Sequence, residues 1–406
     1  MIRELTADCV HCGFCLPTCP TYVLWNEEMD SPRGRIHLMD ARLDGTISLN
    51  ATVTTHFDRC LGCMACVSAC PSGVRYDRLI ETTRAAVEDE YARPLGERLV
   101  RALLFRVLPY PERMRAALRL APLGRFAPLP RRFRPLVEMA PRWRGRGQVA
   151  EVTPANGNPL GRVGLLTGCV QSAVFPDVNA ATARVLAADG LEVVAPPQGC
   201  CGALSVHAGR REEGKGFARR LIGAFDGVDV VVVNSSGCGS HLKELGWLLE
   251  DERAAAFAAK VRDIGELLAE VPPRAPRHPL PLTLALQDPC HVRHAQGLPV
   301  ASLPSLTRIP ALEVVEPAEQ DLCCGSAGIY NVVQPEAARE LADRKAAHIL
   351  ATGAQVYASA NPGCLVQVSQ GLRRAKRPLP ALHPIELVDA SIRAVGAARL
   401  LVQARR

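Results

Sequence analysis

The chain has 406 residues, of which 48% are apolar, and a formal net charge of +7. Its length predicts two or three domains, because one compact core rarely serves so many residues. No apolar run approaches the ~20 residues of a membrane-spanning helix, so any membrane contact is expected to be peripheral.

The chain contains 16 cysteines, enough for a disulfide framework in a secreted protein. Its opening residues, MIRELTADCV, contain no apolar core of a signal peptide. We therefore expect reduced, metal-binding thiols and a cytoplasmic location, with contact on the inner face of the membrane as an option.

The first cysteine run spans Asp8 to Pro20 and reads DCVHCGFCLPTCP. Three thiols follow one another at three-residue spacing, and a fourth comes three residues later, directly before a proline. The same order returns from Arg59 to Pro71 as RCLGCMACVSACP. This is the run with which bacterial ferredoxins bind [4Fe-4S] clusters, and its fourth cysteine binds the other cluster.

The crossed pattern predicts two [4Fe-4S] clusters with interleaved ligands. The first is expected to be held by Cys9, Cys12, Cys15 and Cys70, and the second by Cys60, Cys63, Cys66 and Cys19. Zinc is the alternative, but it usually takes two CxxC pairs or CxxC with HxxxH, and these runs fit that pattern poorly. Eight buried thiols without a metal fit less well still.

A helix is predicted between the two runs. Ser31 is typical of an N-cap, Pro32 of the first helical position, and Gly45 of a helix end. A second helix is expected from Leu79 to Tyr91. Residues 1–92 are therefore expected to form an α-helical ferredoxin-type domain.

The next segment, residues 93–160, is rich in arginine and proline. From Arg93 to Arg146 there are fourteen arginines and three acidic residues. Such a block suits anionic lipid or an acidic partner. No nucleic-acid partner is expected, because no recognition motif accompanies the charge.

An amphipathic helix is predicted at the start of this segment, with Leu95, Leu99, Leu103 and Val107 on its apolar face. That face either packs on the protein itself, which is the commoner case, or docks on a membrane surface or a partner. Residues 109–158 are predicted to form an extended linker.

An α/β pattern begins at Arg162, with short apolar strands at 163–166, 191–194 and 228–233. It begins again near Leu282, and the repeat is explicit: LEVVAPPQGCCG returns as LEVVEPAEQDLCCG. We predict two homologous α/β modules, residues 161–278 and 279–406, separated by the proline-rich VPPRAPRHPLP.

The other eight cysteines occupy equivalent places in this repeat. Each module carries a lone cysteine, a Cys-Cys-Gly and a further cysteine after a later strand; these are Cys169, Cys200, Cys201, Cys238, Cys290, Cys323, Cys324 and Cys364. Adjacent cysteines rarely bond each other because the disulfide is strained. Shared ligation therefore explains the pairs better than disulfides do.

The modules resemble the cysteine-rich CCG domains of heterodisulfide reductase, which hold noncubane iron–sulfur clusters. The pattern there ends in CxxC, but here Cys238 is followed by Gly-Ser-His241 and Cys364 by Leu-Val-Gln367. The fifth thiol is missing, so the five-cysteine cluster is not expected. One or two further four-cysteine clusters, a site for a partner's cofactor or substrate, and a vestigial thiol core remain as alternatives.

Three histidines lie near these cysteines in the sequence. His241 could replace the missing ligand, although a lone histidine after a turn is more often a surface or hydrogen-bonding residue. His291 and His294 flank Cys290 and could hydrogen-bond a sulfur or shuttle protons. The sequence alone does not choose between these roles.

Taken whole, the order of motifs closely resembles the iron-sulfur subunits of bacterial glycolate oxidases. The specific pieces are CPTY at 19–22, SPRGR at 31–35, CPSGVRY at 70–76 and DPCHVRHAQG at 288–297. The resemblance implies a partner subunit with FAD that oxidises glycolate or another 2-hydroxy acid. This chain would carry no catalytic residue and would pass electrons toward a quinone or another acceptor.

The absence of GxGxxG and GxxxxGK motifs agrees with this role, because it leaves the chain without a nucleotide site of its own. Two alternatives remain: a subunit of an anaerobic glycerol-3-phosphate or lactate dehydrogenase, and a catalytic subunit like heterodisulfide reductase. SPRGR and CPSGVRY favour a glycolate oxidase subunit over a glycerol-3-phosphate or lactate dehydrogenase subunit. The missing fifth cysteines disfavour a catalytic subunit like heterodisulfide reductase. Four arginines are expected to favour the reduced clusters, namely Arg33, Arg35, Arg59 and Arg75.

Overall fold

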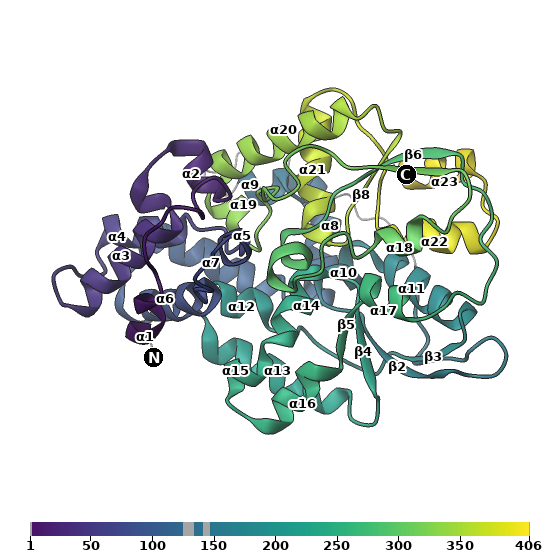
Figure 1. Ribbon diagram of the computed structural model, residues 1–406, viewed down its shortest axis with the longest axis horizontal. Coiled ribbons are helices and arrows are strands. Elements are labelled where there is room, and N and C mark those ends of the chain that lie inside the picture. Colours follow the sequence, from purple (N-terminus) through teal and green to yellow (C-terminus); the bar gives the residue numbers. More distant parts are fainter. Residues whose placement is uncertain (1, 125–133, 141–146, 406) are drawn as a thin grey trace.

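The structure is a computed structural model that describes residues 2–124, 134–140 and 147–405 (Figure 1). Its N-terminal part is helical and lies at one end of the molecule, drawn in purple. The elements there are α1 (Ile2–Ala7), α2 (Pro20–Trp25), the 3-10 helix η1 (Glu28–Asp30), α3 (Pro32–Leu43), α4 (Ala51–Asp58), α5 (Ala65–Ser68) and α6 (Tyr76–Glu90). The expectation of a helical N-terminal region is confirmed.

Local sequence signals explain where α3 begins and ends. The Ser31 hydroxyl accepts a hydrogen bond from the Gly34 amide at 3.0 Å, and Pro32 occupies the first turn. Gly45 follows the helix with a φ of +73°, a conformation that glycine adopts without strain. The buried side chains of Ile36, Phe57 and Leu79 then join these helices into one apolar core.

The arginine-rich segment contains α7 (Leu95–Val107), α8 (Pro111–Gly124) and α9 (Arg134–Glu138). The expected extended linker over 109–158 is therefore wrong for α8 and α9, while 125–133 and 141–146 lie outside the described residues. Met114 and Leu118 lie one helical turn apart on α8, and both pack on Val174 in α10 (Val170–Val174). This packing favours a helix despite the many prolines.

Most of the predicted apolar face of α7 stays exposed, and of its four residues only Val107 packs on a buried cluster, that of Met114 and Leu118. Leu95, Leu99 and Leu103 are 74%, 63% and 45% exposed. The helix instead buries Val100, Leu104 and Phe105 against Ile329 and Leu204, and Arg101 on the same side pairs with Glu97 and Asp58. α7 carries two adjacent apolar stripes, and only tertiary contacts decide which one is covered.

Two sheets follow, and their four parallel strands have the same order, while the first sheet has an additional antiparallel edge strand. The first contains β1 (Val152–Thr153), β2 (Gly161–Leu166), β3 (Leu191–Val194), β4 (Val230–Val233) and β5 (Val261–Asp263) in the order β1-β3-β2-β4-β5. The second contains β6 (Leu282–Leu286), β7 (Leu312–Val315), β8 (Val356–Ala358) and β9 (Ala381–Leu382) in the order β7-β6-β8-β9. All pairs are parallel except β1 with β3, so the sequence repeat is a repeat of structure.

Helical crossovers connect the parallel strands, as parallel pairing requires. With the first sheet are α10, α11 (Pro176–Ala188), α12 (Ala203–His207), α13 (Arg211–Ala224), α14 (Ser236–Lys243), α15 (Leu245–Leu249), α16 (Glu252–Lys260) and α17 (Ile264–Glu270). With the second are the π-helix η3 (His291–Ala295), α18 (Leu303–Leu306), α19 (Tyr330–Val333), α20 (Pro335–Ala351), α21 (Pro362–Arg374), α22 (Pro384–Ile392) and α23 (Ala397–Arg405). Among the described residues no helix is both long and apolar enough to cross a membrane.

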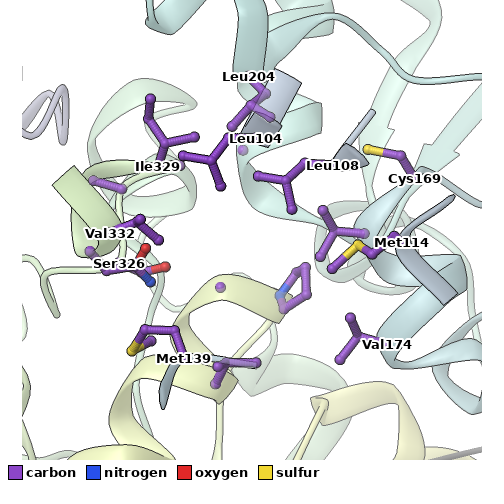
Figure 2. A pocket seen from close by; sticks show the side chains of 18 of the residues that line it. Leu104, Leu108, Met114, Met139, Cys169, Val174, Leu204, Ser326, Ile329 and Val332 are labelled. Atoms are coloured by element: carbon purple, nitrogen blue, oxygen red, sulfur yellow. The ribbon is translucent and has the colours of Figure 1, made fainter. Parts of the chain in front are cut away.

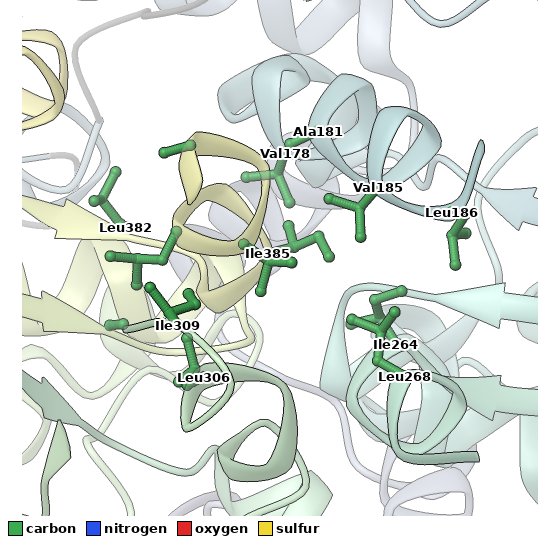
Figure 3. Close-up of a cluster of buried hydrophobic side chains, with 14 of the residues drawn as sticks. Val178, Ala181, Val185, Leu186, Ile264, Leu268, Leu306, Ile309, Leu382 and Ile385 are labelled. Carbon is green, nitrogen blue, oxygen red and sulfur yellow. The ribbon is translucent and has the colours of Figure 1, made fainter. Parts of the chain in front are cut away.

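The two sheets share one apolar core (Figure 3). Val178 and Val185 of α11 and Ile264 of α17 belong to the same buried cluster as Leu306 and Ile385 from the second half. At its edge Arg184 on α11 binds both carboxylate oxygens of Asp389 on α22 at 2.8 Å. The two modules are therefore joined by a shared core and by an ion pair at its edge.

Glu386, in the first turn of α22, makes stability depend on pH. Burial, with Asp177 and Asp389 nearby, raises its pKa from 4.5 to about 7. The folded protein therefore keeps a proton that the unfolded chain loses, and stability present below pH 4.5 is lost as pH rises toward 7. Between pH 4.5 and 7 this ionisation is expected to lower the free energy of unfolding of the parent protein by about 3 kcal/mol. Glu386→Gln should abolish that decrease, because glutamine does not ionise and can still keep the capping box.

The measurement is urea unfolding of the variant and the parent protein at several pH values. Glu112→Gln is the control, because this carboxylate is 93% exposed and should leave the profile unchanged. Identical pH profiles for Glu386→Gln and the parent protein would contradict the assignment.

Candidate metal centre

The first cysteine loop surrounds a small cavity close to the surface. Cys9, Cys12 and Cys15 line it together with Cys70 and Cys66 from the second run. Gly13, with a φ of +89°, turns the loop between these thiols. Cys12 is exposed, and the neighbouring Val10 and Phe14 are 68% and 65% exposed.

The second loop surrounds a deeper cavity. Cys60, Cys63 and Cys66 line it, and the fourth thiol is Cys19, which ends the first run and precedes α2. All four are buried. The structure thus brings each fourth cysteine to the other loop, which is the grouping that crossed ligation requires.

The donors at both cavities suit iron–sulfur clusters, because thiolates are the ligands that such clusters take. The sulfur atoms also receive hydrogen bonds that would stabilise negative charge. The Gly62 amide donates to Cys60 Sγ at 3.4 Å, and the Tyr76 hydroxyl donates to it at 3.7 Å. Burial raises the pKa of Cys60, but the guanidinium groups of Arg35 and Arg84 lower it by more than burial raises it. The net shift of the pKa is therefore downward.

A buried charge network lies beside the second cavity. Asp30, which is fully buried, contacts Arg35 at 3.4 Å, Arg59 at 2.8 Å and the His56 Nδ1 at 2.9 Å. Arg35 is 1% exposed, and its Nη1 lies 4.0 Å from Cys19 Sγ. Arg35 is therefore a positive group held directly against a predicted cluster ligand.

The other predicted arginines have different surroundings. Arg33 lines the first cavity and binds Glu28 and the His11 carbonyl. Arg75 instead pairs with Asp77 and with Glu244 of the first module, and it lines a different cavity.

Arg59→Gln is expected to lower the reduction potential of the second cluster. The substitution removes a positive charge 2.8 Å from the buried carboxylate of Asp30, a residue whose backbone carbonyl lies 3.6 Å from Cys19 Sγ, so the surroundings of the second cavity become more negative. The measurement is a redox titration followed by EPR, with Arg253→Gln, an exposed pair on the first module, as the control. An unchanged potential in Arg59→Gln would contradict the hypothesis.

All eight module cysteines line a single chamber of about 660 Å³. They follow the carboxyl ends of β2, β3 and β4 in the first sheet and of β6, β7 and β8 in the second, where ligands bind in parallel sheets. The sulfur atoms of Cys169 and Cys200 are 3.5 Å apart, and those of Cys290 and Cys323 are 3.9 Å apart. No described cysteine forms a disulfide.

The glycines of the two Cys-Cys-Gly motifs fix this arrangement. Gly202 and Gly325 have φ values of +96° and +85°. A Cβ on Gly202 would lie 2.6 Å from the backbone oxygen of Gly214, and a Cβ on Gly325 would lie 2.7 Å from that of Ala338. Only glycine lets the chain turn here so that both adjacent thiols reach the chamber.

Part of the chamber wall is apolar and comes from the arginine-rich segment (Figure 2). Leu104, Leu108 and Met114 project into it from α7 and α8, and Met139 directly after α9 closes another side. The predicted linker thus builds part of the site.

The second cysteine loop packs directly on the second module. Leu61 and Cys63 share a buried cluster with Cys323, and the Ser68 hydroxyl lies 2.6 Å from the His294 Nδ1. The other nitrogen of His294 contacts the Asp321 carbonyl at 3.1 Å, so His294 joins the two regions. His291 differs, because its Nδ1 lies 3.6 Å from Cys290 Sγ.

His241 is not the surface residue that its sequence context predicts. It is 5% exposed within α14, and burial lowers its pKa to about 4. It lines a neighbouring cavity of about 280 Å³ that also contains Glu81 and Glu244. The described lining of the thiol chamber does not include His241, so the structure does not place it as the missing ligand.

Three residues near the chamber carry no recognisable signal in the sequence. His207 lines it, and the His207 Nδ1 lies 2.8 Å from the Glu81 carboxylate, which comes from α6. Lys345 is 2% exposed near Cys324, and burial lowers its pKa against the opposing effect of the thiols. Glu81 and His207 are 126 positions apart, so only folding brings them together.

Comparisons with known proteins match both cysteine-rich regions of the chain. A model described as "4Fe-4S dicluster domain" matches residues 6–74, and one described as "Cysteine-rich domain" matches 163–243 and 284–369. The probable glycolate oxidase iron-sulfur subunit of Bacillus subtilis is 37% identical over 98% of this chain and 93% of its own length. The chain belongs to the glycolate oxidase iron-sulfur subunit family.

A second family member, the glycolate oxidase iron-sulfur subunit of Escherichia coli, is 36% identical over 96% of both chains. A more distant relative is the lactate utilization protein A of an Exiguobacterium strain, 28% identical over 57% of this chain. This glycolate oxidase-type chain is thus an iron–sulfur protein of electron transport with a role in an oxidoreductase.

Proposed function

We propose that this chain accepts electrons from a partner subunit with FAD that oxidises glycolate or a related 2-hydroxy acid, and passes them to a separate acceptor. The observation that carries the proposal is a continuous series of thiol sites. It runs from the exposed loop at Cys12, through the buried cavity at Cys63, to the chamber at Cys323.

Two [4Fe-4S] clusters are proposed at the first two sites, bound by the crossed sets of cysteines. When bound, they supply the one-electron chemistry that a two-electron flavin needs in a relay. The chain's own residues set the environment: Arg35 and the Gly62 amide stabilise negative charge at the second site, and burial excludes water.

The first loop is the proposed entry point for electrons. Cys12 is exposed between Val10 and Phe14, which form an apolar surface beside the first cavity. Exposed apolar residues of this kind are typical of partner surfaces. A flavoprotein docked here would sit as close to a thiol site as this chain allows.

The module thiols are proposed to hold one or two further clusters of four cysteines. The donor sets are complete, since each module contributes four thiols to the chamber. Catalytic disulfide chemistry is less well supported, because the fifth cysteine of that pattern is absent.

The partner's substrate has one specific alternative. Similarity to lactate utilization protein A, over 57% of the chain, supports lactate as a candidate beside glycolate. The test is to purify the chain with its native partners and add glycolate, lactate or glycerol-3-phosphate. Bleaching of the cluster absorbance by glycolate is expected; bleaching by another compound alone would reassign the substrate, and zinc without iron would overturn the proposal.

A further inference from the structure

We propose that Lys345 is a built-in positive charge for the four cysteines of the second module and directs the electron from the buried cavity to that set. A cluster bound there is then easier to reduce than one bound by the first module. This inference rests on the proposed function, because it needs the relay and the further clusters that are proposed there.

Lys345 lies in α20 and is a buried lysine without a carboxylate partner. It is 2% exposed, and its Nζ donates to the backbone carbonyl of Glu319. The carboxylate of Glu319 binds Arg344 and His348 instead. Among the described residues no carboxylate lies within ion-pair distance of Lys345. Lysine is rarely buried unless it is paired, so a negative group of another kind must lie beside it.

The thiols of the second module are the groups that the structure places there. Cys324 and Cys364 share a buried cluster with Ala346, the residue directly after Lys345. Burial lowers the pKa of Lys345, and the charges of Cys324 and Cys323 oppose that shift. A thiol that binds a metal is deprotonated, so a cluster on these cysteines supplies the lasting negative charge that the buried ammonium group needs.

The first module carries an apolar side chain at the matching position. The glycine of each Cys-Cys-Gly packs on the same place of a helix, which is Gly214 of α13 in the first module and Ala338 of α20 in the second. Seven residues later these helices carry Leu221 and Lys345, which are 1% and 2% exposed. The internal repeat therefore buries both side chains equally but places a charge in only one module.

The second module is also the one that contacts the buried cavity of the ferredoxin-type region. Cys63 lines that cavity and shares an apolar cluster with Cys323 and Cys290. When one electron passes between these two sites, the group at the buried cavity is oxidised and the group at the second module is reduced, with no bond made or broken. A fixed positive charge stabilises the added negative charge, so Lys345 favours this direction.

A redox titration of the purified complex followed by EPR tests the role of this charge. Cys364→Ala and Cys238→Ala each remove one ligand of one module and thereby assign the signals to the modules. Lys345→Gln removes the charge, and its amide can still donate to the Glu319 carbonyl. At a fixed potential the ratio of oxidised to reduced cluster in the second module should rise about tenfold, which is about 59 mV for one electron.

The controls separate the charge from the shape of the side chain. Lys376→Gln removes the same charge from an exposed position of the second module and should leave both module signals unchanged. Lys345→Met should repeat the shift, and Lys345→Arg, which keeps the charge, should restore the potential of the parent complex. Loss of the second-module signal in both neutral variants but not in Lys345→Arg also supports the inference.

A potential like that of the parent in both Lys345→Gln and Lys345→Met overturns the inference. A lowered potential in Lys345→Arg, or loss of the second-module signal in all three variants, assigns Lys345 a structural role and overturns it too. So does a single further cluster that disappears in Cys238→Ala. These outcomes leave the proposed relay intact. Iron for only two clusters in the parent complex would instead contradict the proposed module clusters, and the inference with them.

Discussion

Replacing Cys19 by alanine is expected to remove the cluster on the second cysteine run and to spare the one on its own run. Cys19 lines the buried cavity with Cys60, Cys63 and Cys66, although it follows Cys15 in the sequence. Loss of one of four ligands usually prevents stable assembly, so bound iron should fall by about four atoms per chain.

The measurement is iron and sulfide content together with EPR of the reduced protein. Cys12→Ala is the matched control, because it lies in the same run but lines the other cavity. It should remove the exposed cluster and leave the buried one. The crossed assignment would be wrong if both variants lost the same EPR signal, that is, if Cys19→Ala removed only the exposed cluster that Cys12→Ala removes.

Arg35→Gln is expected to destabilise the helical domain by about 3–5 kcal/mol, because breaking a buried ion pair leaves a charge without its partner. Arg35 contacts the fully buried Asp30 and also donates to the His56 carbonyl at 2.7 Å. Glutamine cannot replace both the charge and the forked geometry. The same change should lower the potential of the second cluster, since Arg35 lies 4.0 Å from Cys19 Sγ.

Anaerobic urea unfolding followed by circular dichroism tests the stability effect, and a redox titration tests the potential. Arg33→Gln is the control, because its pair with Glu28 is partly exposed and should be worth about 0–1 kcal/mol. Equal midpoints for Arg35→Gln and Arg33→Gln would contradict the structural role of the buried network.

Arg33 and Arg35 lie two positions apart in the sequence but differ in burial. Both belong to the SPRGR motif, and their proximity to the cysteines was predictable from spacing. Their burial was not, because it depends on which face of α3 meets α4 and the second loop. The structure places Arg35 inside, against Asp30 and Cys19, and leaves Arg33 at the surface pair with Glu28.

α7 illustrates the same limit for a whole helix. Its periodicity predicts a helix correctly, since the four residues expected on its apolar face all lie within α7. The sequence left open whether the predicted face packs on the protein, because both stripes are apolar. The stripe that packs is the adjacent one, against a surface at Ile329 more than two hundred residues away in the sequence. Of the exposed leucines, Leu103 lines the thiol chamber, whereas Leu95 and Leu99 lie outside its lining.

The sequence by itself determined three things about this protein. The cysteine spacing and the N-cap at Ser31 predicted the helical ferredoxin-type region, and the Cys-Cys-Gly repeat predicted the repeated α/β pattern. Together these motifs indicated the family. These features are local, since spacing, capping and φ preference act over a few residues. Only the tertiary structure decided that all eight module cysteines face one chamber and that α7 and α8 wall it. It alone also placed Glu81 beside His207, because contacts between distant segments depend on how whole elements pack.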